Sequence, residues 1–98
     1  MMAGVETIVR DHPEAHRYEL LVDGVLVGIA DYHPVPGGIA VPHTEIDAAR
    51  RGNGLGEVLV RGMLDDLRGS GLTVVPQCWF VRQFAHDHPE YADLFALD

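Results

Sequence analysis

The sequence predicts one α/β domain of the α+β kind, with its elements in the order β-β-β-β-α-β-α. Short apolar segments separated by turn residues fill the first half of the chain. A run of glycines then comes directly before residues 55–68, whose apolar side chains recur at helical spacing. The chain has 98 residues, 47% of them hydrophobic, which is enough for one compact core. We therefore expect residues 1–98 to form a single domain.

The first half should form an antiparallel sheet, with strands over residues 5–9, 18–22, 25–32 and 39–46. Asp23-Gly24 predicts a tight hairpin turn, because glycine tolerates the positive φ that such turns need. A polar turn is expected at 11–14. The apolar centre of the third strand, 26–30, is expected to be covered on both faces. Residues 33–38 predict a loop, and Pro42 predicts a bulge or an unpaired edge position.

The second half begins with the clearest helix, over residues 55–68. Its apolar stripe consists of Leu55, Val58, Leu59, Met63 and Leu67. On the opposite side, Glu57 and Arg61 have the spacing of a favourable ion pair. A short strand over 72–75, a helix over 79–85 and a last short helix from His88-Pro89-Glu90 should follow.

Composition limits the partners. The formal net charge is −8, and all seven basic residues are arginines, which argues against nucleic acid as a partner. The acidic surface favours a cationic substrate such as an amine, or it serves solubility alone. Cys78 is the only cysteine, which suggests a reducing compartment. No apolar run reaches membrane-spanning length, so we expect a cytoplasmic protein without a membrane partner.

The segment Arg51-Gly52-Asn53-Gly54-Leu55-Gly56 is the most informative part of the chain. Three glycines expose backbone N–H groups, and the helix that follows adds its positive end, which together predict a cradle for phosphate. A simple turn is the alternative. No Lys-Ser or Lys-Thr follows the last glycine, so this is not a Walker loop. Several strands precede it, which is unlike the dinucleotide-binding fingerprint.

This segment resembles the acyl-coenzyme A signature of the GNAT-type N-acetyltransferases, (Gln/Arg)-x-x-Gly-x-(Gly/Ala), which Arg51, Gly54 and Gly56 match. Three further landmarks are similar to those of a minimal, single-domain branch of that family: His43-Thr44, Pro76-x-Cys78 and His88-Pro89-Glu90-Tyr91. The resemblance extends from about Tyr18 to the end of the sequence. It implies a mixed, mostly antiparallel sheet with splayed central strands.

The resemblance also implies a function and a site. The chain would use acetyl-CoA as co-substrate and acylate a small amine or an exposed protein amine. The residues implied in holding coenzyme A are Ile46, Arg51, Gly52, Asn53, Gly54, Leu55 and Gly56. The thioester would lie between the fourth and fifth strands, near His43 and Cys78. The branch lacks the helices that usually wall the acceptor site, so this groove should be open.

The candidate catalytic residues have alternatives of their own. Histidine titrates near neutral pH, so His43 is a candidate base or a residue with only a local hydrogen bond. Cys78 precedes a predicted helix and is a candidate acyl carrier, proton donor or inert core residue. Phe84 and Ala85 stand where many relatives have a tyrosine acid. Tyr91 is expected to pack the C-terminal helix at the surface.

Other functions stay open at the level of sequence. A non-catalytic acyl-CoA-binding sensor or docking module fits the missing tyrosine. A cysteine hydrolase would combine Cys78, His43 and Asp47. A metal site at His12 and His16 or at His86-Asp87-His88 is not expected. Trp79 and Phe80 are expected to anchor the core rather than to stack on bases.

Overall fold

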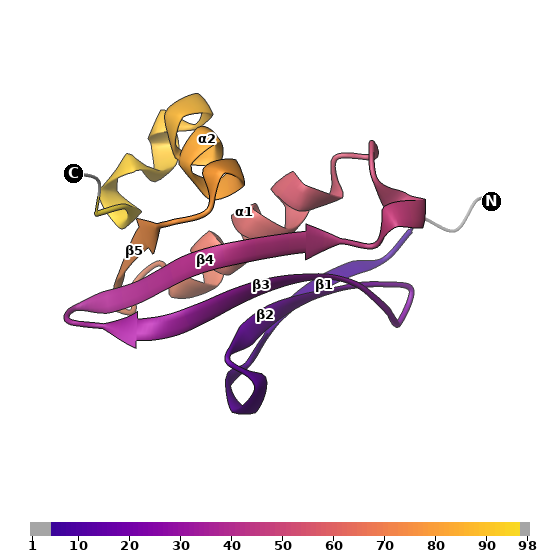
Figure 1. Cartoon of the computed structure of the whole chain (residues 1–98), viewed down its shortest axis with the longest axis horizontal. Coiled ribbons are helices and arrows are strands. Elements are labelled where there is room, and N and C mark those ends of the chain that lie inside the picture. Colours follow the sequence, from indigo (N-terminus) through magenta and orange to yellow (C-terminus); the bar gives the residue numbers. More distant parts are fainter. Residues whose placement is uncertain (1–4, 97–98) are drawn as a thin grey trace.

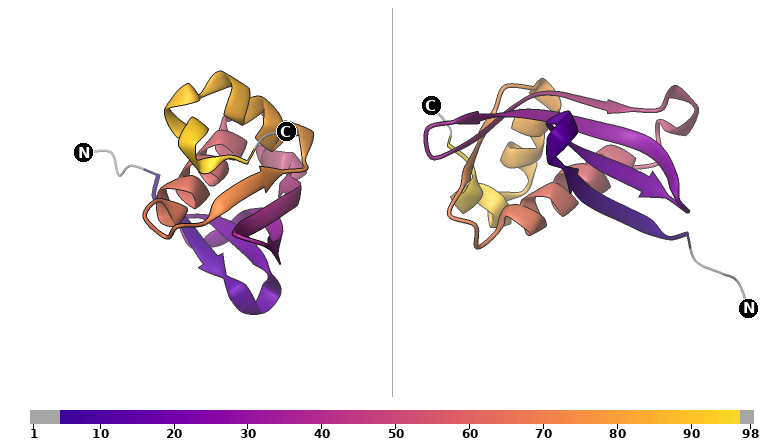
Figure 2. Two further views of the ribbon diagram at one scale, coloured as in Figure 1. Left: turned by 90° about the vertical axis from the view of Figure 1, so that its left-hand side faces the viewer. Right: turned by 90° about the horizontal axis from the view of Figure 1, so that it is seen from below.

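The computed structural model describes residues 5–96. They contain one five-stranded sheet with both α-helices on the same side of it (Figures 1 and 2). The strands are β1 Thr7–His12, β2 Arg17–Val22, β3 Val25–Val35, β4 Gly38–Ile46 and β5 Thr73–Pro76. The α-helices are α1 Leu55–Leu67 and α2 Trp79–Asp87, and the 3-10 helices are η1 Pro13–Ala15, η2 Ala48–Arg50 and η3 Pro89–Leu94. The predicted α+β class and element order are confirmed.

The sheet keeps the strands in sequence order, β1-β2-β3-β4-β5. The first four strands are antiparallel, and β5 pairs with β4 in parallel after the crossover through α1. Asp23 and Gly24 both have positive φ, 48° and 83°, so the predicted tight turn joins β2 to β3. A helical crossover between β4 and β5 is what a parallel pair requires.

Parts of two predicted turns are in fact strand. Asp11 and His12, expected in a turn, belong to β1 because they pair with Tyr18 and Arg17. The predicted loop over 33–38 is wrong for a similar reason: β3 continues to Val35 and β4 begins at Gly38. The hairpin turn is only two residues long, 36–37. A proline at position 34 is tolerated because the pairing of β3 with β2 stops at Asp31. The edge of β3 that faces β2 is therefore unpaired at Pro34.

The core lies between α1, α2 and one face of the sheet. On α1 the buried residues are Leu59, Val60, Met63, Leu64 and Leu67. The buried stripe is wider than predicted because it also includes Val60 and Leu64. Leu55 and Val58, at the start of the helix, are only half-buried. The prediction that 26–30 is covered on both faces is wrong. Leu26 is 45% exposed whereas Val27 is buried, because the helices cover a single face.

β4 changes its surroundings at Pro42. The register between β3 and β4 shifts between Asp31 and His33, so Tyr32 lies opposite both Val41 and Pro42. This is the predicted bulge. β5 pairs with β4 only from Gly38 to Val41 and then departs. The central strands are thus splayed over the second half of β4.

Candidate functional site

The glycine loop after β4 is braced by its own side chains. The carboxylate of Asp47 accepts a hydrogen bond from the backbone N–H of Ala49 (3.3 Å) at the start of η2. Arg51 Nε donates to the carbonyl of Ile46 (3.1 Å), and Asn53 Nδ2 donates to the carbonyl of Arg50 (3.0 Å). None of these contacts uses a backbone N–H from the first turn of α1.

The three glycines of the loop serve two different purposes. Gly52 and Gly54 have φ of 86° and 74°, in the left-handed region that favours glycine, and a Cβ at either would meet no atom within 4 Å. Gly54 caps α1 without a side-chain hydrogen bond, so the N–H groups of the first turn have no capping partner. A Cβ at Gly56 would lie 2.7 Å from the ring of Phe80, so this glycine lets α1 approach α2 closely.

A cavity of about 1020 Å³ opens between the glycine loop, the second half of β4 and the start of α2. Its walls come from residues 42–46, 50–52, 54–57 and 77–80. The cavity brings together every predicted site residue except Asn53, whose side chain donates to Arg50: His43, Ile46, Arg51, Gly52, Gly54, Leu55, Gly56 and Cys78.

One wall of the cavity is a free strand edge. The backbone N–H groups of Gln77 and Cys78 both donate to the carbonyl of Val41 (3.1 and 3.0 Å), and the chain then turns away into α2. Residues 43–46 of β4 therefore pair with β3 on one side and face the cavity on the other. An edge of this kind presents backbone N–H and C=O groups to a bound molecule.

Cys78 lies half-buried at the N-cap position of α2. Its Sγ is 3.4 Å from Oγ1 of Thr44 on β4. Burial alone would raise the pKa of the Cys78 thiol, but the hydrogen bond with Thr44 and the nearby backbone N–H groups of Val81 and Phe80 outweigh it. The pKa of this thiol is therefore lowered, as expected at the start of a helix.

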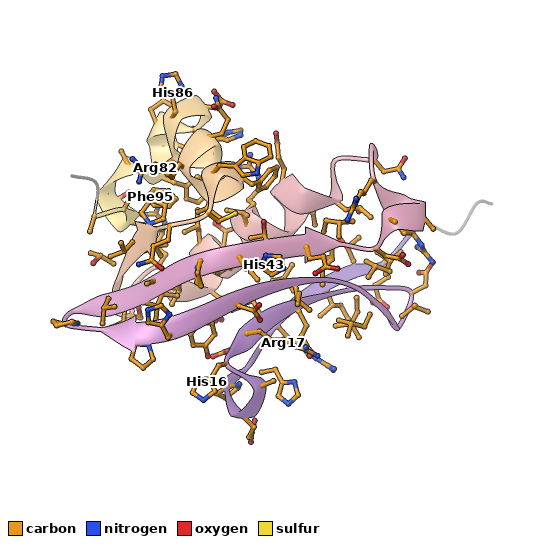
Figure 3. All side chains as sticks on the ribbon, viewed as in Figure 1. His16, Arg17, His43, Arg82, His86 and Phe95 are labelled. Carbon is orange, nitrogen blue, oxygen red and sulfur yellow. The ribbon has the colours of Figure 1, made fainter. Side chains whose placement is uncertain are left out.

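His43 reaches the cavity from the opposite face of β4. Cross-strand partners share a face, and Thr44 pairs with Ala30, in the row of the buried Tyr18, whereas His43 pairs with Asp31. His43 Nε2 lies 3.1 Å from Oε1 of Glu45, and both side chains are more than half exposed. The histidine, labelled in Figure 3, and the thiol thus stand on two sides of one strand.

Sequence reasoning missed the partners of both candidates, Thr44 and Glu45. The two-residue repeat of a strand was the signal available, because it puts His43 with Glu45 on one face and Thr44 on the other. The three groups of the hydrolase hypothesis have three different partners. Cys78 contacts Thr44, His43 contacts Glu45, and Asp47 caps η2. The geometry gives no hydrolase triad.

The aromatic residues near the site are only partly where the sequence suggests. Trp79 was expected in the core, but it is 75% exposed on the cavity wall, while Phe80 is half-buried against Gly56. Tyr91 is buried instead of lying at the surface. Its hydroxyl donates to Asp65 Oδ1 (2.8 Å), away from the cavity. Phe84 is buried beside it.

Within residues 5–96, no three metal-ligating side chains gather in one place. At least one histidine of each candidate metal site has a carboxylate neighbour. His12 contacts Glu19, and His86 lies beside Asp87. No helix in this part of the chain has the length and apolar character to cross a membrane.

Comparison with known proteins gives a consistent result. The family model for the GCN5-related N-acetyl-transferase matches residues 17–94. The solution NMR structure of a GCN5-like candidate N-acetyltransferase from Staphylococcus aureus superposes with a TM-score of 0.70 at 17% identity, covering 93% of this chain and 90% of that one. At this identity the match speaks for the fold. A search of curated proteins found no match. The chain belongs to the GCN5-related N-acetyltransferase family.

Proposed function

We propose that this protein is an acyl-CoA-dependent N-acyltransferase that transfers an acyl group, acetyl by default, from coenzyme A to an amine. One observation carries the proposal. The uncapped first turn of α1 lines the same cavity as Cys78 and the free edge of β4. Amides at a helix N-terminus bind phosphate. The free edge of β4 and the thiol of Cys78 lie in the same cavity and suit the pantetheine arm and the thioester of acyl-CoA.

The cavity fits the parts of acyl-CoA. The diphosphate would lie against the backbone amides of 54–56, with the positive charges of Arg50 and Arg51 nearby. Glycine at 52 and 54 leaves space that no protein atom fills. Asn53 would help only by bracing the loop. The pantetheine arm would follow the edge of β4 near Ile46. The volume, about 1020 Å³, suits a large ligand.

The side chains on the two faces of β4 suggest a division of labour. Acetyl-CoA would supply an acyl carbon activated by its thioester. His43, positioned by Glu45, would accept a proton from the acceptor ammonium on one face. Cys78, held by Thr44 on the other face, would donate its proton to the departing sulfur. The amine would then arrive on one side of the strand while the thiolate leaves on the other.

The acceptor is proposed to be a cationic small molecule or an exposed protein amine. Two carboxylates, those of Glu45 and Glu57, line the cavity, and the whole chain carries a net charge of −8. Both attract an ammonium group.

The proposal is tested by release of the coenzyme A thiol from acetyl-CoA in the presence of an amine panel, from polyamines to lysine-containing peptides. We expect His43→Ala and Cys78→Ala each to lower the rate about 10²–10⁴-fold. Affinity for acetyl-CoA, measured by calorimetry, should persist in both. His86→Ala is a control, since this side chain is 83% exposed and lies on α2 outside the cavity walls. Wild-type rates in either cavity variant would contradict the assignment.

A second function has one observation in its favour. Phe84 and Ala85, which are buried, stand where many GNAT enzymes are expected to have a tyrosine acid. Without that acid, the protein would be a module that binds acyl-CoA and does not transfer the acyl group. Binding of acetyl-CoA with no thiol release for any amine supports this module. An acetyl adduct on Cys78 in intact mass spectra would instead make Cys78 the acyl carrier.

A further inference from the structure

The face of the sheet opposite the helices has a distinct pattern of side chains. Cross-strand register defines three rows on it: His12–Arg17–Asp31–His43, Arg10–Glu19–Ile29–Glu45 and Ile8–Leu21–Leu26. We call these residues the outer face. Both helices pack on the other side of the sheet (Figure 2). Ile8 and Leu26 are accordingly 46% and 45% exposed, which leaves an apolar row in contact with solvent.

The half of the outer face on β1 and β2 is cationic. Glu19 is 2% exposed and receives hydrogen bonds from His12 (2.9 Å), Arg10 (3.1 Å) and Arg17 (2.9 Å). The hydrogen bond with His12 and those with the two arginines hold the pKa of Glu19 at about 2, although burial would raise it. Each arginine turns Nε and Nη2 toward Glu19, so its Nη1 edge is left for another acceptor.

The half on β3 and β4 is anionic. Asp31 lies beside Arg17 in the first row, and Glu45 ends the second row with its side chain 58% exposed. Figure 3 labels Arg17, in the half on β1 and β2, and His43, in the half on β3 and β4. The outer face thus has a positive half, a negative half and an apolar row across β1 to β3.

We propose that two copies of this chain pack outer face to outer face, related by a two-fold axis parallel to the strands and midway between β2 and β3. This rotation exchanges β1 with β4 and β2 with β3. It sets Arg10 over Glu45 of the second copy, Arg17 over Asp31, and Leu21 over Leu26. The contact is self-complementary, as a two-fold interface must be. Two sheets stacked in this way form an aligned sandwich.

Charge favours a second copy over another partner. With a net charge of −8, two copies repel one another through most of their surfaces. The outer face differs, because its two arginines nearly balance its three carboxylates. A basic partner would meet Arg10 and Arg17, and an acidic partner would meet Asp31 and Glu45. A partner with the same pattern reversed satisfies both halves.

The size of the face determines how strong the dimer is. Four strands about 4.8 Å apart, with about six residues each at ~3.3 Å, give a footprint of roughly 19 by 20 Å. Interfaces at this small end of the range are transient. We therefore expect a reversible dimer whose population depends on concentration. In it the second copy also covers His43 and Glu45, so an acceptor amine would reach His43 only in the monomer. That last consequence rests on the proposed function, whereas the dimer does not.

Sedimentation velocity over a concentration series, about 1 μM to 1 mM, tests the dimer on the full chain. The wild type should move from 10.7 kDa toward twice that mass. Leu26→Glu should weaken association by at least about tenfold, because it places a carboxylate against Leu21 of the second copy. Leu72→Glu is the matched control. Leu72 is 38% exposed but lies outside the outer face, so this variant should dimerise like the wild type.

A mixing experiment tests the register. Leu26→Glu mixed with Leu21→Lys should restore the dimer, because the introduced carboxylate of one copy faces the introduced ammonium of the other. Leu26→Glu mixed with Leu26→Lys should not, because each introduced charge then faces a leucine. Circular dichroism checks that each variant is folded. A wild type that stays at 10.7 kDa throughout overturns the proposal and leaves the face to a different partner. Equal association of the two mixtures overturns it as well. Both readouts are masses and do not depend on acyl-CoA.

Discussion

The thiol of Cys78 depends on neighbours from two separate parts of the chain. Thr44 belongs to β4, and Phe80 and Val81 belong to the first turn of α2. The sequence motif identified Cys78 and His43 as candidates, but their partners follow from strand register. A single residue of slip in β4 would exchange the faces of His43 and Thr44. This is why the sequence could name candidates without pairing them.

The contact between Thr44 and Cys78 can be tested by titrating the thiol. Thr44→Val removes a hydrogen bond that lowers the pKa of Cys78, so the pKa should rise and less thiolate should be present at neutral pH. Alkylation by iodoacetamide should slow several-fold at pH 7, and its pH profile should move to higher pH. Thr73→Val is the control, because Thr73 contacts Gly37 instead. An unchanged profile in Thr44→Val would show that the hydroxyl does not act on the thiol.

Among the elements, strands whose ends depend on pairing were the hardest to predict. Residues 33–38 have the composition of a loop, yet β3 and β4 extend through most of them because Pro34 pairs with Ile39 and Val35 with Gly38. The helix α1, whose amphipathic pattern is local, was predicted to within one residue at its end. Local periodicity thus fixes helices well, whereas strand ends depend on backbone pairing with a neighbouring strand, which composition does not reveal.

The junction of β4 with β5 provides a test at this scale. A Cβ at Gly38 would collide with the carbonyl of Thr73 on β5, so Gly38→Ala should cost about 1–3 kcal/mol in the free energy of unfolding. Urea unfolding followed by circular dichroism measures this. Gly37→Asn is the matched control. Gly37 has φ of 76° and open space around it, and asparagine tolerates that backbone region. Equal stability of Gly38→Ala and wild type would argue against the close approach of β4 and β5.

For the whole molecule, the sequence predicted the class, the element order and the family, and the comparisons confirm them. It also named the glycine loop and Cys78 as candidate site residues, and both line one cavity. Two features needed three dimensions. One is the exposed Trp79, since the sequence alone predicts that an aromatic residue at the start of a helix is buried. The other is the bare outer face, because an apolar run such as 26–30 does not reveal which side the helices cover.

The whole fold joins two ends of one cavity. The glycine loop and α1 form the end proposed to bind phosphate, and β4 with the start of α2 forms the end proposed to hold the thioester. The contact between Gly56 and Phe80 holds α1 against α2 where the two ends meet. A ligand long enough to touch both ends would therefore bind to a site whose parts are fixed relative to each other, which lowers the ordering cost of binding.

The central claim is that the first backbone amides of α1 hold a diphosphate. The most direct measurement is an amide NMR titration of the 15N-labelled chain with coenzyme A and, in parallel, with pantetheine, which lacks the diphosphate. We expect coenzyme A to shift the amide resonances of Gly54, Leu55 and Gly56 strongly, and pantetheine to leave them in place while it shifts those of 43–46. Resonances of 54–56 that do not respond to coenzyme A, or that respond equally to both compounds, would contradict the account.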